Sequence, residues 1–281
     1  MNPGIYDISN NEYHSSDGIS RSGISLLKKS PLDYWYKYLS GKQEEKKDTK
    51  SMDFGSLVHT LVLEPHLFDK EFIIEEKHDG RTAIGKQGKI EFEEKAKGRI
   101  VVSKDMLDMA TVMQHEVLNH PHAAAILNGA SFEKSLYWND DETGVLCKTR
   151  PDIWNHEIMV LCDLKTSNDP SRRGFASSAL AYDYHIQAAM QIDSVFIHTG
   201  ILIDIFTFIV LPKEPPYKPY IYILDDMAIE KGRREYKDGL KLLKRCIETN
   251  RWDEDRNHPI GLNFTEYQLS TNSFTELLEK Y

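Results

Sequence analysis

Apolar residues follow two different periods along the chain. Through most of the first 130 residues, and again over 175–198 and 225–249, they recur every three to four positions, which is typical of amphipathic helices. Between 132 and 167, and between 201 and 224, they form short runs rich in β-branched and aromatic residues, which predict strands. The pattern therefore predicts an α/β fold in which helices flank a strand-rich centre.

Capping residues sharpen the predicted helix boundaries. Ser20 or Ser22 can cap an amphipathic segment, Pro31 suits the first turn of a second short helix, and Gly200 suits a C-cap. We expect helices over 20–30, 31–39, 52–64, 81–98, 103–128, 175–198 and 225–249, a loop over 41–51, and a last helix near the end of the 250–281 tail.

The centre of the chain predicts an antiparallel meander. The runs FEKSLYW, VLCKTRPDIW and EIMVLCDLKTS are separated by turn residues at hairpin-length spacing. ILIDIFTFIVL and YKPYIYIL predict two later strands, and EFIIEE predicts an earlier one. Because there is no repeat and no convincing linker, we expect one domain over 1–281. Its parts are an N-terminal helical part (1–130), a strand-rich core (131–225) and a C-terminal helix with its tail (226–281).

Two aspartates and a lysine stand out within RPDIWNHEIMVLCDLKTS. Residues two apart on a strand share a face, so Asp163 and Lys165 point one way while Cys162 and Leu164 point the other. If NHE forms a short connection, Asp152 comes to the same edge, where two carboxylates can hold Mg²⁺. A lysine beside such an ion can orient or deprotonate a water for phosphodiester hydrolysis. On this triplet alone, a structural Asp163–Lys165 salt bridge is the favoured alternative.

Charge and composition narrow the class of protein. The net charge is −9, from 35 basic and 44 acidic residues, which counts against a purely electrostatic nucleic-acid binder but not against an enzyme with one positive channel. Three widely spaced cysteines predict neither a disulfide framework nor a metal–sulfur site. No apolar run reaches 18 residues, and the N-terminus lacks a signal-peptide pattern, so we expect a cytoplasmic protein without membrane association.

The segment GKQGK, at 85–89, is superficially similar to a phosphate-binding loop. No Ser or Thr follows a Gly-Lys pair, and no clear strand leads directly into the segment. We therefore do not expect nucleotide binding there.

Several separated motifs resemble one nuclease superfamily. Pro151-Asp152, ten intervening residues and then Asp163-Leu164-Lys165 match the PD-(D/E)xK signature. Upstream, the Gly55–His59 stretch resembles the G-x-x-x-H helix of RecB-like and RecE-like exonucleases. Downstream, the Tyr184–Gln187 stretch resembles their glutamine-bearing helix. ISRSGISLLKKSPLDYWYKYL, FGSLVHTLVLEP and RTAIGKQGK also resemble stretches of the RecE type, within the lambda-exonuclease-like group. The resemblance covers roughly residues 1–210.

The resemblance implies a site and a fold. It implies a restriction-endonuclease-like core, a central mixed sheet with an antiparallel meander flanked by helices. Catalytic roles are implied for five residues, Asp152, Asp163, Lys165, Glu133 and Gln187. A Mg²⁺ ion, for which Mn²⁺ substitutes, would be held by His59, Asp152, Asp163 and the backbone carbonyl of Leu164. Tyr184 is expected in the core. One departure is that Gln191 occupies the position where RecB-type nucleases often carry a tyrosine.

The implied activity is exonuclease digestion of linear double-stranded DNA, 5′ to 3′, which leaves single strands for recombination. The implied partners are double-stranded DNA ends, a homo-oligomeric ring, expected as a tetramer, and a single-strand annealing protein. Two alternatives stay open: an endonuclease of restriction or repair type on the same core, and a catalytically silent DNA-binding module. The presence of Asp152, Asp163 and Lys165 argues against the silent module.

Contacts to DNA or to a 5′ phosphate are expected from cations near the motifs. Arg21 lies at a predicted helix N-terminus, where an anion is favoured. The expected set is Arg21, Ser22, Lys148, Arg150, Arg172 and Arg173. A second set on the late helix could line a channel or form a solvated face: Lys231, Arg233, Arg234, Lys237, Lys241, Lys244 and Arg245.

Overall fold

A computed structural model of the chain describes residues 1–42 and 50–253. Most of the loop expected over 41–51 and the helix expected near the end of the tail lie outside these residues. The elements in chain order are β1 (Gly4–Tyr6), α1 (Asn10–Ser15), α2 (Arg21–Lys29), α3 (Pro31–Tyr38), α4 (Lys50–Leu63), η1 (Pro65–Leu67), α5 (Phe68–Glu71), β2 (Phe72–Ile74), α6 (Ala83–Ala96), β3 (Ile100–Val102), α7 (Lys104–Asn119), α8 (Pro121–Leu127), β4 (Ser131–Phe132), β5 (Ser135–Asn139), β6 (Leu146–Thr149), β7 (Ile153–Asn155), β8 (Val160–Ser167), α9 (Arg172–Ala181), α10 (Tyr184–Thr199), β9 (Ile205–Pro212), β10 (Tyr220–Ile223) and α11 (Asp226–Thr249).

A mixed sheet of five strands carries the centre of the fold, in the order β10-β9-β8-β7-β4. β8 and β9 are parallel along their whole length, and their connection contains α9 and α10. The other neighbours pair antiparallel. β7 and β8 form the hairpin expected across the NHE segment, with Ile153 opposite Cys162. The predicted α/β fold with a mixed central sheet is confirmed.

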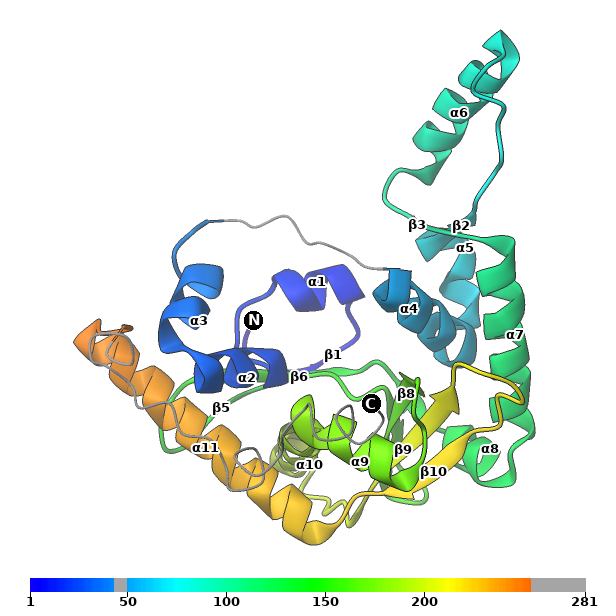
Figure 1. Cartoon of the computed structure of the whole chain (residues 1–281). Coiled ribbons are helices and arrows are strands. Elements are labelled where there is room, and N and C mark those ends of the chain that lie inside the picture. The colour runs from blue at the N-terminus through cyan, green and yellow to red at the C-terminus, as the bar shows by residue number, and fades with distance from the viewer. Residues whose placement is uncertain (43–49, 254–281) are drawn as a thin grey trace, which may run out of the picture.

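The strand period places one apolar layer on each face of this sheet. On one face, Leu161 and Phe208 join residues of α10 and α11 in a buried cluster. On the other face, Cys162 and Leu164 join residues of α4, α7 and α8 in a second cluster. Figure 1 shows α4 and α7 running side by side on that flank. The alternation predicted for Cys162 to Lys165 is therefore present, and it sends the two charged residues to the α10 face.

The single meander expected over 132–167 is wrong, because two of its runs each divide between two sheets. The first run gives β4 and β5, and the second gives β6 and β7. β4 and β7 belong to the five-stranded sheet, whereas β5 and β6 pair in a separate sheet with β1. Pro151 lies at the second division and cannot donate a ladder hydrogen bond. The chain thus crosses twice between the sheets, and we call the two crossing points the seam.

Two expected helices are each divided in the structure. The helix expected over 103–128 is α7 and α8, because Pro121 pushes His120 into an extended conformation (φ −81°, ψ 122°). The helix expected over 175–198 is α9 and α10, separated at Asp183, which is left-handed with φ 55°. Of the expected caps, Ser20 is the N-cap of α2 and Gly200 is the C-cap of α10. Pro31 begins α3 as expected, and Ser30 is the N-cap of that helix.

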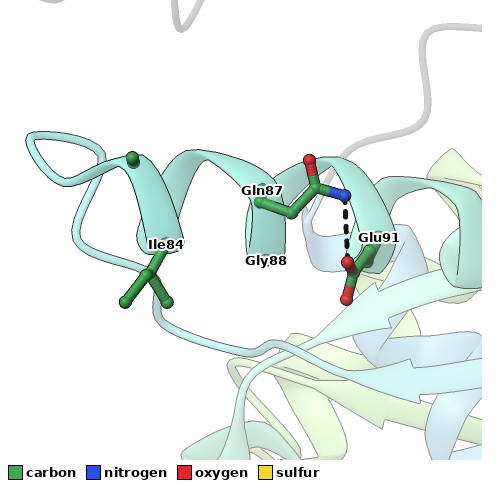
Figure 2. A pocket seen from close by; sticks show the side chains of 5 residues that line it. Ile84, Gln87, Gly88 and Glu91 are labelled. Atoms are coloured by element: carbon green, nitrogen blue, oxygen red, sulfur yellow. Dashed lines mark hydrogen bonds between the residues drawn. The ribbon is translucent and has the colours of Figure 1, made fainter.

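Helix α6 stands out from the body of the molecule on the short parallel pair β2–β3 (Figure 1). The segment GKQGK lies inside this helix, which differs from a phosphate-binding loop between a strand and a helix. Figure 2 shows a shallow hollow on α6, where Gln87 donates to Glu91 at 2.9 Å. The residues that line it are Ala83, Ile84, Gln87, Gly88 and Glu91. No predicted site residue lies among them.

Candidate active site

The site begins where β8 extends past the end of β7. β7 pairs with Val160 to Cys162, and beyond them this edge of β8 has no strand partner among the described residues. Side chains, instead of a neighbouring strand, form hydrogen bonds with the backbone of Leu164. The Asp152 Oδ2 accepts from the Leu164 N–H at 2.9 Å, and the Leu164 carbonyl accepts from His59 Nε2 at 2.6 Å. Asp152, Leu164 and His59 therefore meet at one point.

The seam brings Glu133 to the same point. Glu133 was expected on a strand, but it lies between β4 and β5 with a left-handed φ of 51°, and its N–H donates to the Asp152 carbonyl at 3.2 Å. The Arg150 Nε donates to its carboxylate at 2.6 Å. Ligand atoms of His59, Glu133 and Asp152 all lie within 4.8 Å of one another. The two crossings between sheets thus supply two of the carboxylates in the site.

The pKa values of His59 and Glu133 depend on each other and on the other charges nearby. Burial lowers the pKa of His59, but the carboxylates of Asp152 and Glu133 outweigh it and raise the pKa to about 9. Burial would raise the pKa of Glu133, yet His59 and Arg150 hold it below its usual value. After His59 releases its proton to an incoming ion, its imidazole, two carboxylates and a backbone carbonyl are donors that suit divalent cations such as Mg²⁺ or Mn²⁺. The arrangement therefore fits a divalent metal.

Asp163 and Lys165 form a buried pair beside this group, on the α10 face. The Asp163 side chain is fully buried, and its Oδ2 contacts the Lys165 ammonium. From α10, the Gln187 amide donates to Asp163 Oδ1. The ammonium also lies 5.0 Å from the centre of the Tyr184 ring, which is half-buried and packs against the core as expected. The structural salt bridge weighed from the sequence is present, and it adjoins the group that can hold a metal.

The protonation of this pair depends on its surroundings. Burial, followed by the nearby Asp152 carboxylate, raises the pKa of Asp163 to about 6, although Lys165 opposes the shift. Burial lowers the pKa of Lys165, but Asp163 and Asp152 outweigh it and raise that pKa above its usual value. Asp163 is not within the three-residue group that can share one ion, so the structure places it next to that group.

Two residues expected to contact DNA serve the fold instead. Lys148 is 6% exposed, and its ammonium donates to the Tyr13 and Ser16 carbonyls at 2.7 and 2.6 Å. The Arg150 guanidinium binds Glu133 and also donates to the Ile8 carbonyl at 2.8 Å. Lys148 is buried and Arg150 is partly buried among these partners, so neither is placed to contact a phosphate. Arg150 instead positions Glu133.

The other expected DNA contacts lie nearer the surface. Arg21 begins α2 and donates to the Tyr182 carbonyl at 3.3 Å, and the Ser22 hydroxyl lies 3.0 Å from that of Ser20. Arg172 and Arg173 are exposed at the start of α9, shortly after β8. The structure thus brings Arg21 to the turn between α9 and α10, and it leaves Arg172 and Arg173 open to solvent.

Several cations of α11 hold that helix to the rest of the protein. Arg233 pairs with Asp193 at 2.8 Å, Lys237 contacts Asp140, and Lys241 pairs with Glu142 at 3.0 Å. These pairs favour the structural alternative over a DNA channel for those three residues.

Because Lys148 is buried, it makes the free energy of unfolding depend on pH. Burial lowers its pKa to about 8, whereas an unfolded chain keeps a lysine near its ordinary value of about 10.4. Between these values the unfolded chain binds more protons, so stability rises with pH. We expect the free energy of unfolding of the protein to rise by about 2 kcal/mol relative to Lys148→Met between about pH 7.5 and pH 10, measured by urea denaturation. Lys218→Met, at an exposed lysine, should parallel the unaltered protein. Parallel curves for Lys148→Met would contradict the assignment.

Some features of the site were not expected from the sequence. Gln191, at the position where RecB-type nucleases often carry a tyrosine, is buried one turn after Gln187. Its amide donates to the Arg150 carbonyl at 3.4 Å and so stabilises the seam. The four-residue spacing between Gln187 and Gln191 could have predicted that both side chains lie on the same face of the helix. A second group, Asp183, His185 and Glu235, also brings three possible ligand atoms together. The Lys28 ammonium already bridges two of these, Asp183 at 3.1 Å and Glu235 at 3.0 Å, so this group is an ion-pair network.

A five-stranded mixed sheet with this Pro-Asp and Asp-Leu-Lys arrangement defines the PD-(D/E)xK fold. A family described as "PDDEXK-like domain of unknown function (DUF3799)" matches residues 20–257, and the chain belongs to that family. A search of curated proteins found no match to this chain. A crystal structure of a "putative exonuclease" from Eubacterium rectale is similar at 16% identity, covering 94% of this chain and 98% of that one with a TM-score of 0.60. A crystal structure of SSO0001 aligns at 14% identity over 85% and 96% of the two chains, with a TM-score of 0.30.

None of the helices in the described ranges is both long and apolar enough to cross a lipid bilayer.

Proposed function

We propose that the protein is a Mg²⁺-dependent exonuclease of RecE type that degrades linear double-stranded DNA, 5′ to 3′, and leaves single-stranded DNA for recombination. One observation carries the proposal: His59, Glu133 and Asp152 gather within 4.8 Å, beside a buried pair formed by Asp163 and Lys165. Such a group of donors, next to a lysine held by a carboxylate, suits metal-assisted phosphodiester hydrolysis.

Each residue has a distinct part in the proposed reaction. His59, Asp152 and the Leu164 carbonyl would hold the metal, and Asp163, the preceding residue of β8, would lie beside them. A bound divalent ion supplies Lewis-acid polarisation of the phosphoryl oxygen and a more acidic water. Lys165 would orient the attacking water through its ammonium, or would take up a proton from that water after first releasing its own.

Two further residues position this machinery. The Gln187 amide fixes Asp163, and its Oε1 is buried without a hydrogen-bond partner in the described ranges. Glu133, held by Arg150, adds negative charge beside the metal.

Exonuclease action, rather than endonuclease action, is supported by two likenesses. The sequence motifs resemble RecE-type exonucleases, and the structurally similar protein from Eubacterium rectale is named a "putative exonuclease". The sequence resemblance to RecE-type exonucleases also supports a homo-oligomeric ring, with four copies expected, and a single-strand annealing protein as partner. Arg21, with Ser22 beside it, is proposed to receive the 5′ phosphate, and Arg172 and Arg173 to approach the duplex backbone. Mn²⁺ is proposed to substitute for Mg²⁺.

The proposal is tested with matched linear and covalently closed circular duplexes of one sequence. In Mg²⁺ the linear form should be degraded to mononucleotides, with the 5′-phosphorylated end preferred over the 5′-hydroxyl end, and the closed circle should stay intact. EDTA should stop the reaction, and Mn²⁺ should restore it. Cutting of the closed circle would favour the endonuclease alternative. Binding without any cutting would favour the silent DNA-binding module.

A further inference from the structure

Tyr182 presents an exposed aromatic ring beside the candidate site. Its side chain lies in the turn between α9 and α10, and the residue is 60% exposed. Its ring stacks on that of Tyr184, with centroids 5.9 Å apart and planes inclined by 27°. Tyr184 in turn lies 5.0 Å from the Lys165 ammonium. An aromatic row therefore leads from the Lys165 ammonium to solvent and ends in a ring whose outer face is open.

The backbone under this ring is fixed from several sides. Arg21 donates to the Tyr182 carbonyl at 3.3 Å, and the Tyr182 N–H donates to the Ser178 carbonyl at 2.9 Å. The next residue, Asp183, has a left-handed backbone and pairs with the Lys28 ammonium at 3.1 Å. A left-handed aspartate costs free energy that the surrounding contacts must offset. The turn thus holds Tyr182 in a defined place.

We propose that Tyr182 is a stacking platform for a DNA base next to the scissile phosphate. The inference rests on the proposed nuclease function and deepens it. Every base has a π face, so an exposed aromatic ring binds single-stranded or frayed ends without reading sequence. Arg21 and Lys165 place positive charge beside the aromatic row, which suits the phosphates on either side of a stacked base. Tyr182 thereby positions the terminal nucleotide.

Two measurements test the stacking. First, duplexes carrying 2-aminopurine at one of the first three nucleotides are bound in EDTA, which stops metal-dependent hydrolysis, and their fluorescence is recorded. The protein and Tyr182→Phe should quench at least one of these positions, and Tyr182→Ala should not. Second, steady-state digestion of linear duplex in Mg²⁺ should show KM raised about tenfold in Tyr182→Ala, with kcat within about twofold. Tyr182→Phe should have a KM close to that of the protein.

Leu180→Ala is the matched control, because Leu180 is in the same segment, is also 60% exposed and has no aromatic ring. It should leave quenching and KM unchanged. Equal quenching by the protein and Tyr182→Ala, an unchanged KM in Tyr182→Ala, or an equal loss in Leu180→Ala overturns the inference. Failure of Tyr182→Phe alongside Tyr182→Ala also overturns it, since a phenyl ring still stacks. Quenching without hydrolysis in Mg²⁺ would instead reject the proposed function and leave the stacking in place.

Discussion

Replacing Lys165 with alanine is expected to slow hydrolysis of linear duplex DNA by about 10³-fold, the size typical of a lost proton-transfer group. The Lys165 ammonium contacts Asp163 and lies over Tyr184, so its position beside the metal-binding group is fixed before substrate arrives. Alanine removes the positive charge of Lys165 and also the amine that could act as a base after losing its proton. The measurement is the single-turnover rate of nucleotide release at saturating Mg²⁺.

The Lys165→Arg variant distinguishes two possible roles of the Lys165 side chain, as a positive charge and as a proton acceptor. Arginine keeps the positive charge near Asp163 but does not give up its proton in a protein. If Lys165 accepts a proton from water, the arginine variant should be as slow as the alanine variant. If it acts through charge alone, arginine should restore most of the rate. A rate within tenfold of the unaltered protein in Lys165→Ala would contradict any catalytic part for Lys165.

Asp152→Asn is expected to weaken the binding of Mn²⁺ by about 100-fold or more and to reduce hydrolysis at least as strongly. The asparagine carbonyl can still accept the hydrogen bond from the Leu164 N–H, so the end of β8 should keep its shape. What it loses is the negative charge that faces His59. Isothermal titration with Mn²⁺ in the absence of DNA measures this effect directly.

Glu157→Gln provides the control for that charge. Glu157 is exposed in the turn that joins β7 to β8, so the variant removes the same formal charge from the same hairpin without touching the site. Its Mn²⁺ affinity should match that of the unaltered protein. Equal weakening in both variants would mean that net charge, rather than the position of Asp152, controls metal binding.

Local sequence pattern was sufficient where a single strand or helix decides the geometry. The two-residue period of β8 placed Asp163 and Lys165 on one face. The short connection after β7 brought Asp152 to the same edge. These placements need no knowledge of distant partners, whereas His59 was expected at the site only from the resemblance of Gly55–His59 to the G-x-x-x-H motif.

Long-range pairing set the parts that the sequence did not predict. Nothing in FEKSLYW indicates that its second half pairs with β1, over 100 residues away, and this pairing creates the seam at Glu133. Charge counts also could not separate Lys148 and Arg150, buried among carbonyls and a carboxylate, from the exposed Arg172 and Arg173. Whether a cation is solvated depends on which backbone groups the fold brings to it.

The most direct test of the account compares the protein with Asp163→Asn on end-labelled linear duplex DNA, across a titration of Mg²⁺. The account predicts Mg²⁺-dependent release of mononucleotides by the protein, and a rate lower by about 10³-fold in the variant, because asparagine no longer holds the Lys165 ammonium. Thermal unfolding at a temperature close to that of the unaltered protein would confirm that the variant is folded. Undiminished, Mg²⁺-dependent digestion by folded Asp163→Asn would contradict the account.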